Sequence, residues 1–522
     1  MFSNQTAKVS TQKSVFTLKA IAAAVTLCAG STAFAAATGG FSTTDGGSVS
    51  GSQAFTASTL DQLNTIVANA KAGNYPVVIT YTGNEDSLIN QMIANHTVDA
   101  SGNCPNPRWN DAYRKVEIKE MTKGVTIIGA NGSSANFGIV VNKSSNVIIR
   151  NMKIGALAGA NNDADMIRID SGTNVWVDHN ELFAVNNECK GSPDGDLTFE
   201  SAIDIKKDSH NITVSYNVIR DSKKVGLDGS SSSDIAGGRE ITFHHNIYRN
   251  VNARLPLQRG GWTHMYNNLY DGITDSGINV RQAGYSLIES NWFQNAKNPI
   301  TCRYDSSNCG FWDLRNNNVK TPGDFATYNI TWSSGGTIDA TNWTTTAPFP
   351  ISIPYSYSPV TPQCVKDKLD QYAGVGKNGA QLTASACGGT TSSVASSVAV
   401  SSSSKSSSSV AVVSSSSAVS SSKASSSAAA VSSSKASSSS AAVSSASGAP
   451  VLSGTGDYPS GFSKCADLGG TCSVTSGDGW VAFGRKGSWV VKKVSVPGSI
   501  ACTVAAFGSD PQGNPNKCSY KK

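Results

Sequence analysis

The stretch Val175-Trp176-Val177-Asp178-His179-Asn180 decides the fold, because its pattern returns along the chain. Each copy is a short run of alternating apolar residues that ends close to an asparagine. Two further copies are Ile212-Thr213-Val214-Ser215-Tyr216-Asn217 and Ile241-Thr242-Phe243-His244-His245-Asn246. The asparagines that recur at this point are Asn151, Asn180, Asn217, Asn246, Asn268 and Asn291.

The spacing of these asparagines predicts a solenoid. Their intervals are 29, 37, 29, 22 and 23 residues, which fits a base period near 22 residues with insertions. One strand pattern per period predicts stacked coils. Asparagine can adopt left-handed backbone and bond neighbouring backbone groups, so stacked asparagines can form a ladder. We expect an all-β right-handed parallel β-helix, since a β-sandwich or propeller gives no reason for asparagine at one place per coil.

Length and charge narrow the class of protein. The chain has 522 residues, a net charge of +6 and only 15% charged residues. This length predicts two or more units. The chain lacks a dense Lys/Arg run, so we expect neither a nucleic-acid nor a membrane partner, and the mild basic excess suits a polyanionic carbohydrate. We expect a monomer.

Composition divides the chain into four parts. Residues 1–35 read as a signal peptide, with lysines, a short apolar stretch and an Ala33-Phe34-Ala35 cleavage site, so we expect secretion to the extracellular space. Residues 36–389 hold the repeats. Residues 390–449 form a Ser-rich linker without aromatic residues. Residues 450–522 form a small Cys-rich β module.

The cysteines favour disulfides. Eleven are present, and removal of Cys28 with the signal peptide leaves an even number, as is typical of secreted chains. Local spacing suggests the pairs Cys104–Cys189, Cys302–Cys309 and Cys364–Cys387. Cys465, Cys472, Cys502 and Cys518 are expected to pair among themselves.

Four carboxylates in two successive coils predict a cation site. Asp163 and Asp165 lie two apart, so on a strand they face the same side, and Glu200 and Asp204 flank the start of the next strand. Clustered acids repel one another unless a cation lies among them, and ligands that are all oxygen suit Ca²⁺ better than Zn²⁺. A purely structural calcium and solvated surface acids are the alternatives.

Basic residues follow these acids along the chain. Arg254 and Arg259 lie five apart around Pro256, and Arg forks bind carboxylates in bidentate fashion. Lys206 and Lys224 add positive charge upstream. Surface salt bridges are the alternative role. On a solenoid, however, this order predicts acids beside bases on one wall, which suits an anionic sugar bridged by calcium.

Five motifs together resemble the polysaccharide lyase family 1 pectate lyases, of the pectate lyase C type. The resemblance extends over nearly all of residues 38–389 and leaves out the Ser-rich linker and the module. The motifs occur in the family's order: Asp163-x-Asp165, Trp176-Val177-Asp178-His179, Glu200-x-x-x-Asp204, Val225-Gly226-Leu227-Asp228-Gly229 and Arg254-x-Pro256-x-x-Arg259.

The resemblance implies a calcium-dependent enzyme that cleaves polygalacturonate by β-elimination on a parallel β-helix. Asp165, Glu200 and Asp204 resemble the primary calcium ligands, and Asp163 joins them when substrate brings further calcium. Arg254 matches the residue proposed as catalytic base. The residues that match binders of the galacturonate carboxylates are Lys206, Lys224 and Arg259. Because a guanidinium is protonated at neutral pH, an arginine base implies an alkaline pH optimum.

Three other polar residues call for structural interpretations. We expect His179 to be a hydrogen-bonded structural histidine and treat Asp178 in the same way. We expect Asp228 to shape a turn.

The C-terminal module combines aromatic and basic residues. It holds Tyr458, Phe462, Trp480, Phe483, Trp489, Phe507 and Tyr520 among an excess of lysines. These rings either form its small core or stack on sugars, and the long tether favours a carbohydrate-binding module.

Three alternative functions remain open. A pectin lyase on the same fold acts on neutral methyl esters and would not need the acidic cluster. A β-helix hydrolase acting through paired carboxylates would lack the Arg-x-Pro-x-x-Arg motif. A non-catalytic pectin-binding protein would not need every motif residue intact.

Overall fold

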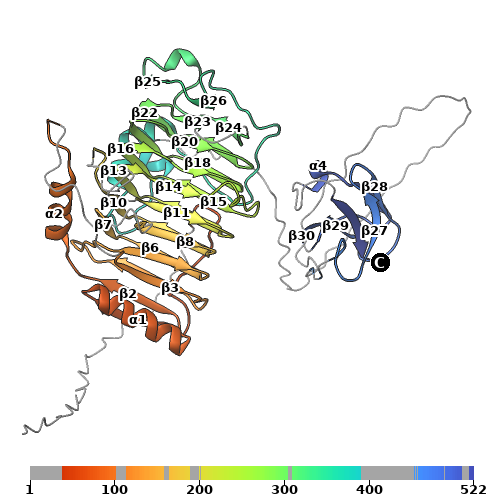
Figure 1. The fold of residues 1–522 in the computed structure, drawn as a ribbon, viewed down its shortest axis with the longest axis horizontal. Coiled ribbons are helices and arrows are strands. Elements are labelled where there is room, and N and C mark those ends of the chain that lie inside the picture. The colour runs from red at the N-terminus through yellow and green to blue at the C-terminus, as the bar shows by residue number, and fades with distance from the viewer. Residues whose placement is uncertain are drawn as a thin grey trace, which may run out of the picture. The chain divides into compact units, whose positions relative to one another are not determined.

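The computed structural model describes residues 38–101, 113–157, 164–187, 199, 201–303, 308–388, 452, 454, 456–486, 488–507 and 516–521. Within these residues the N-terminal part is a parallel β-helix, as predicted, whose strands stack like rungs in Figure 1. The middle coils contribute one strand to each of three sheets, and in the described part of the chain these sheets have ten, nine and seven strands.

The ten-stranded sheet consists of β1 (Gln53–Ala57), β2 (Val77–Tyr81), β4 (Val125–Gly129), β6 (Ser145–Arg150), β9 (Thr173–Asp178), β12 (His210–Ser215), β15 (Glu240–His244), β18 (Trp262–Tyr266), β21 (Tyr285–Glu289) and β24 (Phe311–Arg315). The nine-stranded sheet consists of β3 (Lys115–Lys119), β5 (Gly138–Asn142), β8 (Ile167–Asp170), β11 (Ile203–Lys206), β14 (Gly226–Asp228), β17 (Leu257–Gln258), β20 (Ile278–Val280), β23 (Ile300–Arg303) and the antiparallel β26 (Gly336–Asp339). The seven-stranded sheet consists of β7 (Lys153–Gly155), β10 (Glu181–Phe183), β13 (Val218–Lys224), β16 (Ile247–Ala253), β19 (Leu269–Ile273), β22 (Trp292–Lys297) and β25 (Ile330–Thr331).

A continuous apolar core fills the solenoid. In the ten-stranded sheet Val175, Ile212 and Ile241 are stacked in register and fully buried. In the nine-stranded sheet Ile167 and Ile203 do the same. Alternation along each strand sends these side chains inward and their neighbours outward.

A ladder of buried asparagine amides fixes the register between coils. The Nδ2 atom of Asn217 donates to Oδ1 of Asn246 at 2.9 Å, and Nδ2 of Asn246 donates to Oδ1 of Asn268 at 3.0 Å. Each Oδ1 also accepts a backbone N–H, as in Asn217 N to Asn246 Oδ1 at 3.0 Å. The complete ladder is Asn180, Asn217, Asn246, Asn268, Asn291 and Asn317.

The predicted ladder was wrong in including Asn151, in leaving out Asn317 and in its backbone conformation. Asn151 stands one residue before the ladder position of its coil. That position is occupied by Met152, whose backbone N–H donates to Oδ1 of Asn180. Asn151 instead has a φ of 55° and donates to the Gly129 carbonyl. The left-handed position thus belongs to the residue before each ladder asparagine, such as His179 with a φ of 55°.

Helices and both ends of this part of the chain cover the solenoid. Helix α1 (Leu60–Gly73) lies at its N-terminal end, followed by α2 (Asp86–His96) (Figure 1). A C-terminal segment, residues 349–388, contains α3 (Pro362–Lys368) and packs on the ten-stranded sheet through hydrogen bonds such as Val360 N to Asn267 Oδ1 at 2.8 Å. A disulfide joins Cys364 in α3 to Cys387, and a second joins Cys302 to Cys309.

The C-terminal module has its own sheets and core. A four-stranded antiparallel sheet has the order β27 (Phe462–Asp467), β32 (Lys517–Lys521), β29 (Trp480–Arg485) and β30 (Ser488–Lys493). A second sheet pairs β28 (Thr471–Val474) with β31 (Gly498–Ala501), and a short helix, α4 (Val504–Phe507), follows. Disulfides join Cys465 to Cys472 and Cys502 to Cys518. Cys104 and Cys189 lie outside the described residues.

In the part of the chain that the structure describes, we find no helix long and apolar enough to cross a membrane.

Two buried histidines lie between the sheet and the N-terminal segment. The Nδ1 atoms of His244 and His245 are 2.9 Å apart, and Nε2 of His244 lies 2.7 Å from the Thr38 carbonyl oxygen. A carbonyl only accepts, so Nε2 of His244 donates and its Nδ1 accepts from His245. Nε2 of His245 is then an unprotonated nitrogen without a partner in the described residues. Both rings are therefore held neutral.

This neutrality makes stability depend on pH. Burial lowers the pKa of His244 to about 4, and burial together with His244 holds the pKa of His245 well below its usual range. The unfolded chain binds protons below about pH 6.5, where the folded chain does not, so the free energy of unfolding falls as the pH drops from 6.5 toward 4. Each histidine contributes about 1.4 kcal/mol per pH unit in this window.

We predict that His245→Phe flattens this dependence. The phenyl ring can keep the stacking on Tyr216, whose centroid lies 4.7 Å away, but it cannot bind a proton. Thermal melts between pH 5 and 7 check the slope, and His210→Phe at a half-buried site is the matched control. Equal slopes for the wild type and His245→Phe would contradict the assignment.

Candidate active site

The outer face of the nine-stranded sheet carries Asp204 and Lys206. Asp204 and Lys206 lie on β11, with their alternation partners Ile203 and Ile205 in the core. Asp165 precedes β8 and is not part of a strand, which corrects the expectation that it lies on one. Asp163 and Glu200 lie outside the described residues.

Lys206 holds two buried carboxylates together. Its Nζ lies 2.8 Å from Oδ2 of Asp204 and 3.3 Å from Oδ2 of Asp165, and all three side chains are almost inaccessible to solvent. Burial disfavours the charged ammonium, but Asp204 and Asp165 outweigh it and raise the pKa of Lys206. The other oxygen of Asp204 accepts the backbone N–H of Leu227 at 2.9 Å. Asp165 and Asp204, two of the four predicted acids, therefore lie close together around one ammonium.

Arg254 follows the end of β16 in a left-handed conformation. Its φ is 68°, which is uncommon for a residue with a side chain, and such strained positions concentrate at functional sites. Bonds between neighbouring coils hold both flanks: Val225 N donates to the Ala253 carbonyl at 3.0 Å and Leu255 N to the Gly277 carbonyl at 3.1 Å.

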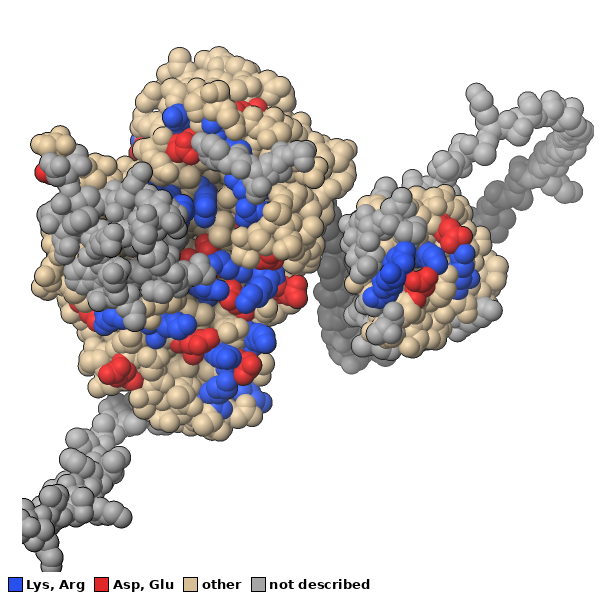
Figure 2. Space-filling view, viewed as in Figure 1, with Lys and Arg blue, Asp and Glu red and all other residues tan. Residues whose placement is uncertain are grey.

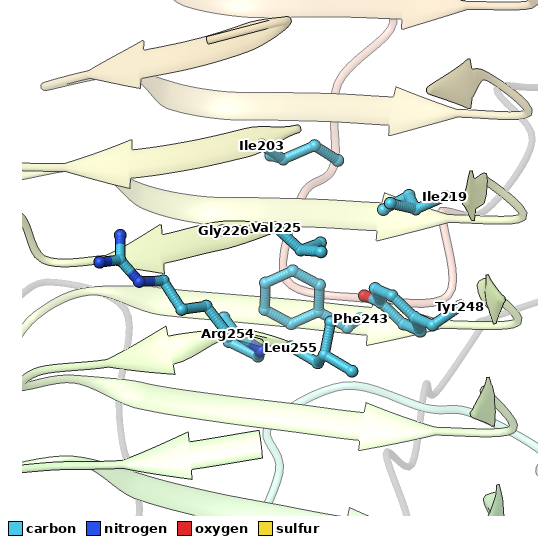
Figure 3. Close-up of a pocket in the computed structure, with 9 residues that line it drawn as sticks. Ile203, Ile219, Val225, Gly226, Phe243, Tyr248, Arg254 and Leu255 are labelled. Atoms are coloured by element: carbon cyan, nitrogen blue, oxygen red, sulfur yellow. The ribbon is translucent and has the colours of Figure 1, made fainter. Parts of the chain in front are cut away.

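The Arg254 side chain is available for substrate. Within the described residues its guanidinium makes no ion pair or hydrogen bond. Below its backbone, apolar side chains that include Phe243 and Leu255 leave a cavity of only about 10 Å³. Figure 3 shows the guanidinium directed away from this apolar packing. A firmly packed backbone thus presents a cation outward.

Lys224 and Arg259 flank Arg254 in the neighbouring coils and turns. Lys224 ends β13 in register with Ala253, the residue before Arg254. Arg259 follows β17, and its backbone N–H donates to the Asp228 carbonyl at 2.6 Å. The Nη1 atom of Arg259 donates to the Gly229 carbonyl at 3.0 Å.

Arg239 is a buried residue that the sequence interpretation missed. Its Nη1 donates to the Arg259 carbonyl at 2.6 Å, and its Nη2 donates to the Lys207 carbonyl at 2.7 Å. Nη2 also pairs with Asp234 Oδ1 at 2.5 Å. One guanidinium, 1% exposed, thus joins the turn after Lys206 to the turn that carries Arg259. No sequence signal marks it, because two of its partners are backbone carbonyls.

The sequence predicted that Asp228 shapes a turn, and this prediction was wrong. Asp228 ends β14, and its side chain is buried. Both carboxylate oxygens lack a hydrogen-bond partner in the described residues. It stacks in register on Ile205, and burial raises its pKa well above the usual range. A protonated acid inside the coil is therefore expected.

Asp178 and His179 lie on another face and serve the structure. His179 Nδ1 lies 2.8 Å from Asp178 Oδ2, and its Nε2 lies 3.0 Å from the Ala380 carbonyl in the C-terminal segment. Its ring stacks on Tyr216 with centroids 4.8 Å apart. This arrangement agrees with a structural role for His179.

The donor chemistry fits a calcium ion in kind. Asp165 and Asp204 offer only oxygen ligands from neighbouring coils, and they are already drawn together by a cation. The described residues contain no group of three or more His, Cys, Asp or Glu side chains that could hold a metal. Figure 2 shows Lys and Arg side chains next to Asp and Glu side chains across the middle of the visible solenoid face.

Comparisons with known proteins agree with this geometry. The family model described as pectate lyase matches residues 14–378. Pectate lyase 3 from Pectobacterium atrosepticum is 57% identical over 383 residues, which are 71% of this chain and 99% of the relative. Pectate lyase B from Dickeya chrysanthemi is 58% identical over 378 residues, covering 70% of this chain and 98% of the relative.

Solved structures are similar as well. Pectate lyase C from Erwinia chrysanthemi, determined at pH 9.5 with 30 mM Ca²⁺, has a TM-score of 0.63 and 57% identity, covering 67% of this chain and 99% of that chain. A mutant of pectate lyase C in complex with pentagalacturonic acid has the same TM-score, identity and coverage. The chain belongs to the pectate lyase family. It is an enzyme with pectate lyase activity, as the sequence predicted.

We predict that Arg239→Lys weakens substrate binding more than turnover. An ammonium cannot reproduce the planar fork that joins the two turns, so Lys206 and Arg259 lose their alignment. We expect KM for polygalacturonate to rise about tenfold, or ~1.4 kcal/mol, with less than a threefold change in kcat.

The control is Arg249→Lys, which alters an exposed pair with Asp370. Steady-state kinetics and melting temperatures of both variants separate alignment from general stability. A fall in kcat with KM unchanged would assign Arg239 a different role.

Proposed function

We propose that this enzyme is a secreted, calcium-dependent pectate lyase that cleaves (1,4)-α-D-galacturonan by β-elimination to 4,5-unsaturated oligogalacturonides. The observation that carries the proposal is the placement of Lys206 between two buried carboxylates. The same solenoid presents the Arg254 guanidinium, which makes no ion pair or hydrogen bond among the residues that the structure describes. Carboxylates can bind a metal ion, and basic side chains near them can bind the carboxylates of a polyanionic substrate that the metal bridges to the protein. The complex of a similar enzyme with pentagalacturonic acid supports this substrate class.

Binding uses the fixed cations. Lys206, Lys224 and Arg259 pair with galacturonate carboxylates, and the Arg fork favours bidentate contact. Arg259 and Lys206 are held by bonds to backbone or carboxylate groups, so little reorganisation accompanies binding. We propose the four acids Asp163, Asp165, Glu200 and Asp204 as calcium ligands. When bound, the ion neutralises the galacturonate carboxylate and so stabilises negative charge that develops on it.

The chemical step falls to Arg254. This residue removes the proton at C5, the electron pair forms the C4–C5 double bond, and the C4–O bond breaks. The leaving oxygen takes a proton from water. Because arginine is normally protonated, the step is favoured at alkaline pH. The guanidinium points away from the apolar packing, and the hydrogen bonds on both sides of Arg254 fix its backbone, which supports this assignment.

Secretion and domain organisation are part of the proposal. The disulfides within the described residues persist in oxidising compartments, which supports export after removal of residues 1–35. Residues 36–389 then form the catalytic domain, 390–449 a linker and 450–522 a carbohydrate-binding module. The Cys104–Cys189 pair remains a prediction.

The deciding assay follows the ultraviolet absorbance of unsaturated products. Purified enzyme is given polygalacturonate with added calcium and then with a chelator. We expect absorbance to rise with calcium and to stop on chelation, with recovery on return of excess calcium. New reducing ends without absorbance would mean a hydrolase. Absorbance on methylated pectin that resists chelation would mean a pectin lyase.

A second prediction concerns Arg254→Lys. A proton acceptor at this position contributes about 10²–10⁴-fold, so kcat should fall by at least about 100-fold. The folded structure should persist, because the guanidinium makes no ion pair within the described residues. Far-ultraviolet circular dichroism and the absorbance assay test this together. Wild-type kcat in this variant would exclude Arg254 as the base.

A further inference from the structure

The four-stranded sheet of the C-terminal module has one face packed on the module's core. Val481 and Phe483 on β29 are fully buried there, and Phe483 stacks on Phe507 at 4.9 Å. Phe483 and Phe507 therefore form part of the module's core and are not available to stack on sugars.

The opposite face carries the tryptophans. Because side chains alternate along a strand, Trp480 and Gly484 lie on this face, opposite Val481 and Phe483. Their register partners on β30 are Lys493 and Trp489. The Nζ atom of Lys493 lies 5.6 Å from the Trp480 ring centroid. Strand β30 is the last strand of the sheet, and on it Lys493 is exposed and Trp489 is partly exposed. Trp480 on β29 is 8% exposed and lies beneath Lys493.

A second ring and cation lie on the neighbouring strand. Lys517 on β32 is in register with Gly484, which places it on the same face. Its Nζ lies 5.9 Å from the Tyr458 ring centroid and 2.6 Å from Asp457 Oδ2. The Trp489 Nε1 donates to the Asp457 carbonyl at 3.2 Å, so residues 457–458 connect the two ring–cation groups.

The module's charge is strongly unbalanced. Its described residues carry seven basic side chains (Lys464, Arg485, Lys486, Lys492, Lys493, Lys517, Lys521) against three acidic ones (Asp457, Asp467, Asp478). Lys486 and Lys493 are exposed and make no ion pair within the described residues. Figure 2 shows Lys and Arg atoms on both sides of Asp and Glu atoms on the module's visible surface.

We propose that this outer face, formed by Tyr458, Trp480, Trp489, Lys493 and Lys517, binds polygalacturonate, which rests on the proposed substrate of the catalytic domain. Sugars pack on aromatic surface while their carboxylates pair with the lysines beside the rings. A neutral glucan would offer the exposed ammonium of Lys493 no anionic partner, whereas a galacturonate carboxylate can pair with it. The Ser-rich tether then keeps the catalytic domain at high effective concentration on the same polymer.

Affinity electrophoresis of the full chain tests this proposal. Gels contain polygalacturonate, and a chelator prevents turnover. Lys493→Gln and Trp489→Ala alter the outer face, and Lys377→Gln changes a partly exposed lysine of the catalytic domain as matched control. We expect wild type and Lys377→Gln to be retarded equally. Both face variants should bind at least about threefold more weakly, and added salt should weaken the wild type.

Two results would contradict the proposal. Unchanged retardation of both face variants would overturn the proposal, as would stronger retardation of the wild type by hydroxyethylcellulose than by polygalacturonate. The gels report binding without turnover, so failure of the absorbance assay would reject the proposed activity separately. Lys493 is exposed, so we expect Lys493→Gln to fold. This variant therefore still tests the proposal if Trp489→Ala does not fold.

Discussion

The hydrogen-bonded stack of asparagine amides is the constraint on which the rest of the solenoid depends. Each amide donates to the next and accepts a backbone N–H from the coil before it, so every coil meets its neighbour at one fixed point. The buried amides have all their polar atoms engaged, which makes the alternative registers costly. Intervals between 22 and 37 residues can therefore coexist, because extra residues leave the coil as loops without moving the ladder.

Fixed register is what allows a site to be assembled from distant residues. Asp204 and Lys206 share one coil, Asp165 belongs to the coil before it, and Arg254 comes from a later one. Parallel pairing of β11 with β8 and of β13 with β16 fixes the strands beside these residues. The site then adds its own constraints. Lys206 offsets the repulsion of two acids, and Arg239 fixes the turns on either side. In both places a buried cation holds the surrounding groups in one arrangement.

Much of the fold could be predicted from the sequence because the strand–asparagine repeat is a local pattern. The strand–asparagine repeat predicted the β-helix, and the order of acids and bases predicted the wall that carries them. Asn151 was assigned to the ladder because asparagine also suits the left-handed position one residue earlier. Arg239 was missed because its partners at residues 207 and 259 are carbonyls, which every residue has. Asp228 looked like a turn residue beside Gly229, but coil stacking places it inside.

The Cys364–Cys387 disulfide has a mechanical consequence. Residue 387 is the last cysteine before the Ser-rich linker, so any pull transmitted along that linker enters the catalytic domain at this covalent bond. The bond passes the load to α3, whose Val365 is fully buried in a cluster with Leu269 and Trp292 of the solenoid. Tension is thereby spread over packed side chains instead of peeling the C-terminal segment from the sheet one hydrogen bond at a time. If residues 450–522 hold the polymer as proposed, the C-terminal segment carries the load as one packed unit.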